Sequence, residues 1–281
     1  MSMRTISHLI KPQTVAEGAG VSLQRSIAPL RSNEYDPFLL LDHFSFRNPR
    51  QGEPRGFPMH PHRGIETVTY MLEGGTAHRD SLGNSGFIGA GSVQWMTSGR
   101  GILHEEMPRK SERGGVNGFQ IWVNLPAAKK MTAPRYQEVN AETIPTVSHH
   151  GATVRVIAGQ FLETQGPVQE IAAQPLYFDV RLDAGATFTQ AVPSAHTVLA
   201  YVFEGDGYFG AEQALIPATH LVMFEPGDEI HVRTDSGVRF LFLAGAPFHE
   251  PIVPYGPFVM NTLQEIQQAV RDLQNGTFVT A

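Results

Sequence analysis

Short runs of apolar or alternating residues, separated by turns, recur along almost the whole chain. Five clear runs are ETVTYML (66–72), GFQIWVNL (118–125), LYFDVRL (176–182), TVLAYVFEG (197–205) and VRFLFLAG (238–245). Glycine-rich turn signals follow most of them, such as EGG at 73–75. Many short strands at this spacing predict an all-β sandwich or barrel rather than a parallel α/β sheet.

The strand pattern lapses between about 126 and 150, where the chain is rich in proline, alanine and polar residues. A faint internal repeat, TYMLEGG at 69–75 and AYVFEGDG at 200–207, lies on either side of this segment. We therefore predict two antiparallel β-barrels in tandem, at 1–133 and 151–281, joined by a linker at 134–150. The Lys pair Lys129 and Lys130 is expected to lie on a solvated connection.

One segment has the period of an amphipathic helix. Within NTLQEIQQAVRDLQNG the apolar residues recur at helical spacing, Thr262 and Glu265 have the spacing of a capping box, and Gly276 suits the C-terminal stop. The pattern predicts a helix over about 262–275, at the end of the second barrel. Its predicted packing face consists of Leu263, Ile266, Val270 and Leu273.

Composition narrows the chemistry. The chain has 281 residues, a net charge of −6 and no cysteine. The negative charge argues against a nucleic-acid surface, and no apolar run has the roughly 18 residues of a membrane span. The N-terminus has no apolar stretch typical of a secretory signal, so a cytoplasmic location is expected. Without thiolates, a bound metal would need nitrogen and oxygen ligands.

Two short motifs carry such ligands. His60 and His62 in MHPHRGIE are two residues apart, as are His104 and Glu106 in GILHEEMP. Side chains two apart on a strand share a face, so neighbouring strands would present three imidazoles and one carboxylate to a common point. A metal ion would offset the cost of burying that carboxylate.

The alternatives are weighed on the same residues. A lone His-x-His is weak evidence, and Glu105 beside Glu106 is by itself typical of a solvated charge pair. Glu66 has the same parity as the two histidines, although Gly64 between them can break it. Spacing alone does not choose between Glu66 and Glu106 as the fourth ligand.

Longer stretches carry a resemblance. MHPHRGIETVTYMLEGG followed by GSVQWMTSGRGILHEEMP resembles the pirin family, whose members consist of two cupin barrels. Similarity extends to DPFLLLDHF at 36–44, WVNLPAAKKMTAPRYQE at 122–138 and the C-terminal helix, and so covers most of the chain. The resemblance implies a bicupin fold whose metal ligands are His60, His62, His104 and Glu106, with Glu66 left outside direct ligation. Gln94 stands where many other cupins have their last metal histidine.

The second barrel has no His-x-His, so we expect one metal per chain. Isolated histidines there are expected to be structural, and the two in the linker are expected to face solvent; these are His196, His220 and His231, and His149 and His150.

Three imidazoles and a carboxylate suit Fe(II), Mn(II), Ni(II), Cu(II) or Zn(II), and the resemblance favours Fe(II). It also implies quercetin 2,3-dioxygenase-like chemistry on a flavonol and O2, with Glu106 accepting the substrate's hydroxyl proton. Apolar side chains near the motifs are possible pocket walls, although core packing is the simpler interpretation of each: Phe57, Met59, Trp95 and Met96.

The alternative function is a metal or redox sensor that binds a transcription factor or a metabolic enzyme. No motif identifies such a partner, and we expect a monomer with no direct contact to nucleic acid or membrane.

Overall fold

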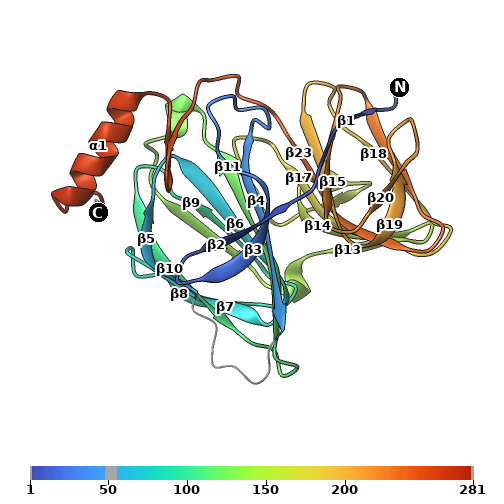
Figure 1. The fold of residues 1–281 in the computed structure, drawn as a ribbon, viewed down its shortest axis with the longest axis horizontal. Helices are drawn as coiled ribbons and strands as arrows, with labels where there is room; N and C mark the ends of the chain where they lie inside the picture. The colour runs from blue at the N-terminus through green and yellow to red at the C-terminus, as the bar shows by residue number, and fades with distance from the viewer. Residues whose placement is uncertain (1, 48–55, 280–281) are drawn as a thin grey trace. The chain divides into compact units, whose positions relative to one another are not determined.

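The structure is a computed structural model, and it describes residues 2–47 and 56–279. The chain forms two compact units, which are coloured by sequence in Figure 1. The N-terminal unit contains Gln13–Glu142 with Phe248–Ala281, and the C-terminal unit contains Met1–Pro12 with Thr143–Pro247. Strands dominate both units, which confirms the predicted all-β class.

Two sheets form the N-terminal unit. The seven-stranded sheet has the order β12 (Arg135–Val139), β9 (Val93–Thr97), β6 (Ile65–Glu73), β11 (Gly115–Asn124), β4 (Phe38–Arg47), β3 (Val21–Ile27), β2 (Gln13–Glu17). The four-stranded sheet has the order β5 (Phe57–His62), β10 (Ile102–Arg109), β7 (Gly75–Asp80), β8 (Ser85–Gly89). The unit also contains η1 (Ala127–Lys129), the hairpin β24 (Val253–Tyr255) and β25 (Phe258–Met260), and α1 (Leu263–Gln274).

The C-terminal unit is built mainly on one ten-stranded sheet. Its main path is β1 (Ile6–Ile10), β21 (His220–Phe224), β19 (Thr197–Phe209), β23 (Val238–Gly245), β17 (Leu176–Leu182), β14 (Ala152–Ala158), β13 (Thr146–His149). Three further strands join this sheet. β20 (Ala214–Pro217) and β22 (Glu229–Arg233) pair with β19, and β18 (Thr187–Ala191) pairs with β22. A small hairpin adds β15 (Gln160–Phe161) and β16 (Thr164–Gln165), and η2 (Ala141–Thr143) lies where the units meet in sequence.

The observed division differs from the predicted boundaries at both ends of the chain. β1 pairs with β21, so the first residues belong to the C-terminal unit, and α1 contacts β24 and β25 in the N-terminal unit. The predicted linker at 134–150 also contains strands, because β12 pairs with β9 and β13 pairs with β14. These pairings join segments far apart in sequence, which local periodicity does not detect.

The C-terminal helix is confirmed. Thr262 caps its first turn by accepting from the Glu265 amide, and the Glu265 side chain completes the capping box. The packing face is narrower than predicted. Ile266 and Ala269 are buried with Val270 partly buried against them, whereas the end residues Leu263 and Leu273 are exposed. Within the described residues, no helix is long and apolar enough to cross a bilayer.

Lys130 was expected to be solvated, and this prediction is wrong. The side chain is buried, and its ammonium group donates to the carbonyl oxygens of Gly64 and Val259 and to the side-chain oxygen of Asn124. Three acceptors at 2.6–2.8 Å replace the water that a buried ammonium loses. Lys130 thus connects the segment after β5 to β25 through hydrogen bonds.

Candidate metal centre

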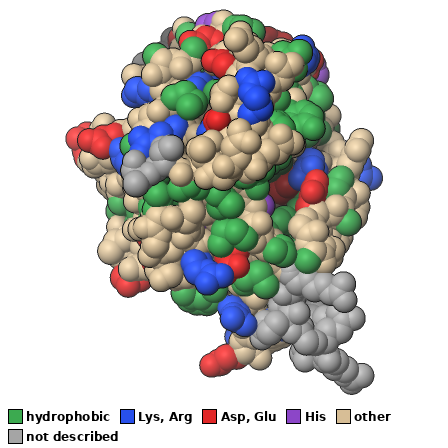
Figure 2. All heavy atoms as spheres, turned by 90° about the vertical axis from the view of Figure 1, so that its left-hand side faces the viewer, with side chains coloured by type: hydrophobic (Ala, Val, Ile, Leu, Met, Phe, Trp, Pro, Cys, Tyr) green, Lys and Arg blue, Asp and Glu red, His purple; other side chains and the backbone are tan. Residues whose placement is uncertain are grey.

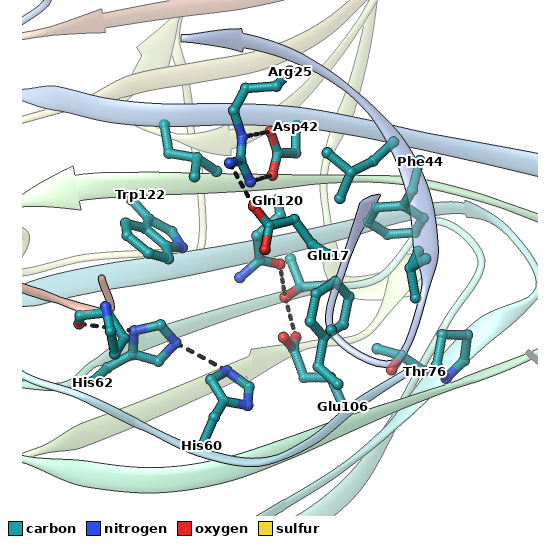
Figure 3. Close-up of a pocket in the computed structure, with 18 of the residues that line it drawn as sticks. Glu17, Arg25, Asp42, Phe44, His60, His62, Thr76, Glu106, Gln120 and Trp122 are labelled. Atoms are coloured by element: carbon teal, nitrogen blue, oxygen red, sulfur yellow. Dashed lines mark hydrogen bonds and ion pairs between the residues drawn. The ribbon is translucent and has the colours of Figure 1, made fainter. Parts of the chain in front are cut away.

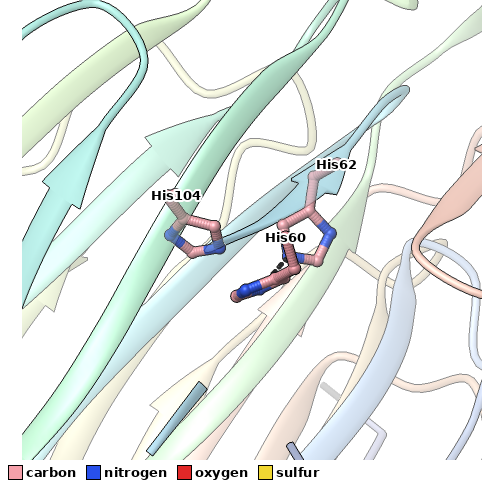
Figure 4. Close-up of side chains that lie close together, drawn as sticks. All are labelled: His60, His62 and His104. Carbon is pink, nitrogen blue, oxygen red and sulfur yellow. Dashed lines mark hydrogen bonds between the residues drawn. The ribbon is translucent and has the colours of Figure 1, made fainter. Parts of the chain in front are cut away.

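Pairing between β5 and β10 brings the predicted histidines together. His104 lies directly opposite His60 in this antiparallel pair, and Ile102 lies opposite His62. The ring centroids of His60 and His104 are 4.3 Å apart, and those of His62 and His104 are 5.0 Å apart. One ring nitrogen from each histidine falls within 4.8 Å of the other two (Figure 4). The shared face predicted from the two-residue spacing is therefore confirmed for the histidines.

Backbone carbonyls orient two of the rings. His60 Nδ1 lies 2.8 Å from the Pro58 carbonyl oxygen, and His62 Nδ1 lies 3.3 Å from the Pro257 carbonyl oxygen. A carbonyl only accepts, so each Nδ1 carries a proton, and in the neutral ring the Nε2 then presents a lone pair. The two Nε2 atoms face each other at 3.1 Å. In neutral rings this is a contact between two acceptors, which a cation would relieve.

Burial keeps the rings of His62 and His104 neutral. It lowers the pKa of His62 to about 3, with repulsion from His60 adding to the effect. Burial also holds the pKa of His104 well below its usual range. Neither ring nitrogen of His104 has a hydrogen-bond partner among the described residues. Neutral imidazoles with converging lone pairs are the donor set that a divalent metal ion binds, so these three residues fit such an ion.

Glu106 lies on the same cavity wall but outside the tight histidine group. It shares the inward face of β10 with His104, whereas Glu105 points outward and pairs with Arg79. Glu106 Oε1 accepts from the Thr69 hydroxyl at 2.8 Å, and Figure 3 shows its carboxylate beside His60. Ligation by Glu106 stays a prediction.

Glu66 is directed elsewhere. Gly64 has a φ of +80°, and the alternation of faces is broken between His62 and Glu66. The buried Glu66 carboxylate accepts from the Thr97 hydroxyl at 2.7 Å and does not line the histidine cavity. Burial raises its pKa to about 7, against the lowering effect of the hydrogen bond from Thr97.

A cavity of about 510 Å³ opens from the histidines into the N-terminal unit. This size is within the range of small-molecule sites. Most of its walls are apolar, and Figure 3 shows Trp122 and Phe44 on two sides of it. On the molecular surface in Figure 2, histidine and acidic side chains are visible inside a hollow.

Sequence reasoning identified few of the cavity residues. Phe57 lines the cavity, but Met59 is largely exposed, and Trp95 and Met96 are buried outside the lining. His78, which no motif singled out, is buried on β7 opposite Glu106, with its ring centroid 5.3 Å from that of His104. The pairing of β7 with β10 positions it, and this pairing left no signal in local spacing.

The interior of the C-terminal unit is filled by packed apolar side chains. Aromatic rings pack against one another at centroid distances of 5.3–5.9 Å, among them Phe161, Phe178, Phe188, Phe209, Phe240 and Phe242. Among the described residues, only His60, His62 and His104 form a group able to hold a metal.

Together, the two strand-built units and the histidine cluster define a two-domain β protein with a candidate metal centre, and comparison with known proteins gives the class as cupin. The models named Pirin and Pirin C-terminal cupin domain match residues 20–123 and 177–279. A human protein named Pirin is 44% identical over 276 residues, covering 96% of this chain and 92% of its own. The chain belongs to the pirin family.

Two further relatives have names that mention an activity. A Pseudomonas aeruginosa protein, provisionally named a quercetin 2,3-dioxygenase, is 44% identical over 279 residues and 97% of each chain. A crystal structure described as quercetin 2,3-dioxygenase from Acinetobacter baumannii has a TM-score of 0.90 and 34% identity, covering 99% of each chain. The predicted tandem cupin fold is confirmed by these matches.

Metal content tests the ligand set. Because His62 supplies one of three converging lone pairs, His62→Ala is expected to lose most of the bound metal, and so is Glu106→Ala if its carboxylate completes the set. Glu66→Gln is the matched control and is expected to retain the metal, since its contacts are with Thr97. Elemental analysis of the purified proteins gives the answer. Equal metal in wild type and Glu106→Ala would exclude Glu106 as a ligand.

Stability against pH tests the buried Glu66. Its folded pKa of about 7 lies above the ordinary 4.5, so its stabilising contribution is complete below pH 4.5 and is lost as pH rises through 7. Glu66→Gln does not titrate. Its unfolding free energy relative to wild type is therefore expected to rise by about 2–3 kcal/mol between pH 5 and 8.

Urea unfolding with a chelator present measures this difference, and titration of the histidines cancels because both proteins contain them. A difference that does not change with pH would show that Glu66 titrates normally.

Proposed function

We propose that this protein is a non-haem iron dioxygenase that acts on flavonols such as quercetin. The observation that carries the proposal is the position of the three clustered imidazoles at one end of a largely apolar cavity. The names of the Pseudomonas and Acinetobacter relatives support the same activity. A divalent metal held by these imidazoles and Glu106 would lower the pKa of a flavonol hydroxyl.

The chain's own residues supply the rest of the chemistry. The Glu106 carboxylate accepts the proton of the substrate's 3-hydroxyl, and the Thr69 hydroxyl holds Glu106 by donating to Oε1. Apolar walls that include Leu40, Phe44 and Trp122 pack against the aromatic rings and exclude water from the site. His60 and His62 are fixed by the Pro58 and Pro257 carbonyls, so they need no rearrangement when substrate enters.

Oxygen uptake tests the activity. With Fe(II) confirmed in place, the protein is expected to consume O2 with quercetin and to release carbon monoxide, because cleavage of the flavonol ring expels the carbon between the two oxygen-bearing positions. His104→Ala is expected to abolish uptake, since it removes a central member of the cluster. His149→Ala, on an exposed residue of the C-terminal unit that is not part of the cavity lining, is the control and is expected to keep the uptake.

Absence of uptake across a broad flavonol and catechol panel, with iron present, would contradict the enzyme proposal. The alternative would then be a metal or redox sensor, whose affinity for a protein partner changes with the metal. The cytoplasmic location and the monomeric state are likewise proposals that follow from the sequence.

A further inference from the structure

We propose that the cavity has a second anchor, at the end away from the histidines, which binds an uncharged hydroxyl-bearing ring of the substrate. The anchor consists of Arg25, Asp42 and Glu17, and Gln120 connects it to the metal end. This inference rests on the proposed function, because it assigns the same cavity to the same substrate. It adds that the end of the substrate away from the metal must carry uncharged hydroxyl groups.

A row of polar side chains crosses the seven-stranded sheet in register. Arg25 on β3 pairs with Asp42 on β4, Asp42 pairs with Gln120 on β11, and Gln120 pairs with Thr69 on β6. Directly paired residues of antiparallel strands share a face, and all four line the cavity. Figure 3 shows Arg25 and Asp42 at one end, His60 and His62 at the other, and Gln120 between them.

The length of the row matches an elongated aromatic ligand. Neighbouring strands are about 4.8 Å apart, so Asp42 lies roughly 10 Å along the sheet from Thr69, which contacts Glu106. This separation is comparable with the long axis of a three-ring flavonol. Apolar side chains flank the row on both sides, with Leu40 opposite Trp122 in one direction and Phe44 opposite Gly118 in the other.

Hydrogen bonds at the far end leave both donor and acceptor capacity. Arg25 binds Asp42 through Nε and Nη2 at 2.8 and 2.7 Å, and Glu17 through Nη1 at 2.8 Å. A guanidinium has five N–H groups, so this arrangement leaves two of them. Glu17 uses one carboxylate oxygen here, and its side chain is 43% exposed, compared with 5% for Asp42.

Charge decides what kind of group fits this end. Two carboxylates around one guanidinium have a formal charge of −1. A carboxylate or phosphate offers no donor and would meet this negative charge, whereas a phenolic hydroxyl donates to Glu17 and accepts from Arg25. Gln120 Oε1 contacts the Thr69 hydroxyl, so its Nε2 is left to contact a ligand between the two ends of the cavity. The cavity therefore selects a neutral polyhydroxylated ring system.

Anaerobic calorimetric titration of the metal-loaded protein tests this anchor without requiring turnover. The probes are quercetin and galangin, flavonols that differ only in the two hydroxyls of the side ring. A hydrogen bond to a charged group is worth about tenfold in affinity or more, so wild type is expected to bind quercetin about tenfold more tightly than galangin.

Glu17→Ala is expected to bring that ratio close to one while leaving galangin affinity unchanged, which also shows that the cavity is intact. Glu142→Ala, on an exposed residue outside the cavity lining, is the control and keeps the wild-type ratio. Equal binding of both flavonols by wild type, or an undiminished ratio in Glu17→Ala, overturns the second anchor. Selective binding without O2 uptake supports the anchor and counts only against the dioxygenase.

Discussion

The convergence of three imidazole rings on one point is the constraint on which the site depends. The Pro58 and Pro257 carbonyls fix the protons of His60 and His62 on Nδ1, and the pairing of β5 with β10 places His104 opposite His60. Buried acceptors that face one another are costly when nothing donates to them. A divalent cation would satisfy both nitrogen acceptors, so the backbone contacts that orient the two rings also suit the site to an ion.

The polar row extends this constraint across the sheet. A shift of one residue in the register of β11 would turn Gln120 away from the cavity and bring Phe119 or Ile121 into its place. Both are buried on the other face, so their packing holds the register. The packing of the opposite face of the sheet therefore fixes where Asp42 and Gln120 lie. It also fixes the position of Thr69, which contacts Glu106.

The sequence was sufficient to place the two dyads on shared strand faces because period-two spacing is local information. His60 and His62, and His104 and Glu106, share faces as predicted, and the capping box of α1 is equally local. Contacts between distant segments were missed for the opposite reason. A lysine in a polar stretch looks solvated until Gly64 and Val259 are known to surround it, as they do Lys130.

Arg25 and Asp42 show the same limit within the site. They are 17 positions apart, and neither has a neighbour in sequence that marks it as functional. Only the pairing of β3 with β4, of β4 with β11 and of β11 with β6 places them in line with Thr69.

The two cupin units share a fold, but one contains a cavity and the other a packed core. In the C-terminal unit the inward positions of the strands carry apolar side chains, and Phe178 on β17 and Phe242 on β23 stack at 5.6 Å. In the N-terminal unit, strands β4 and β11 carry Asp42 and Gln120 at inward positions instead. Burying polar side chains in a dense core costs free energy because they lose hydrogen bonds to water. Polar side chains on paired strands can instead hydrogen-bond to one another and line a cavity. The polar residues that line the cavity are cross-strand neighbours, and the hydroxyls of the proposed substrate would use the hydrogen-bonding capacity that these residues leave.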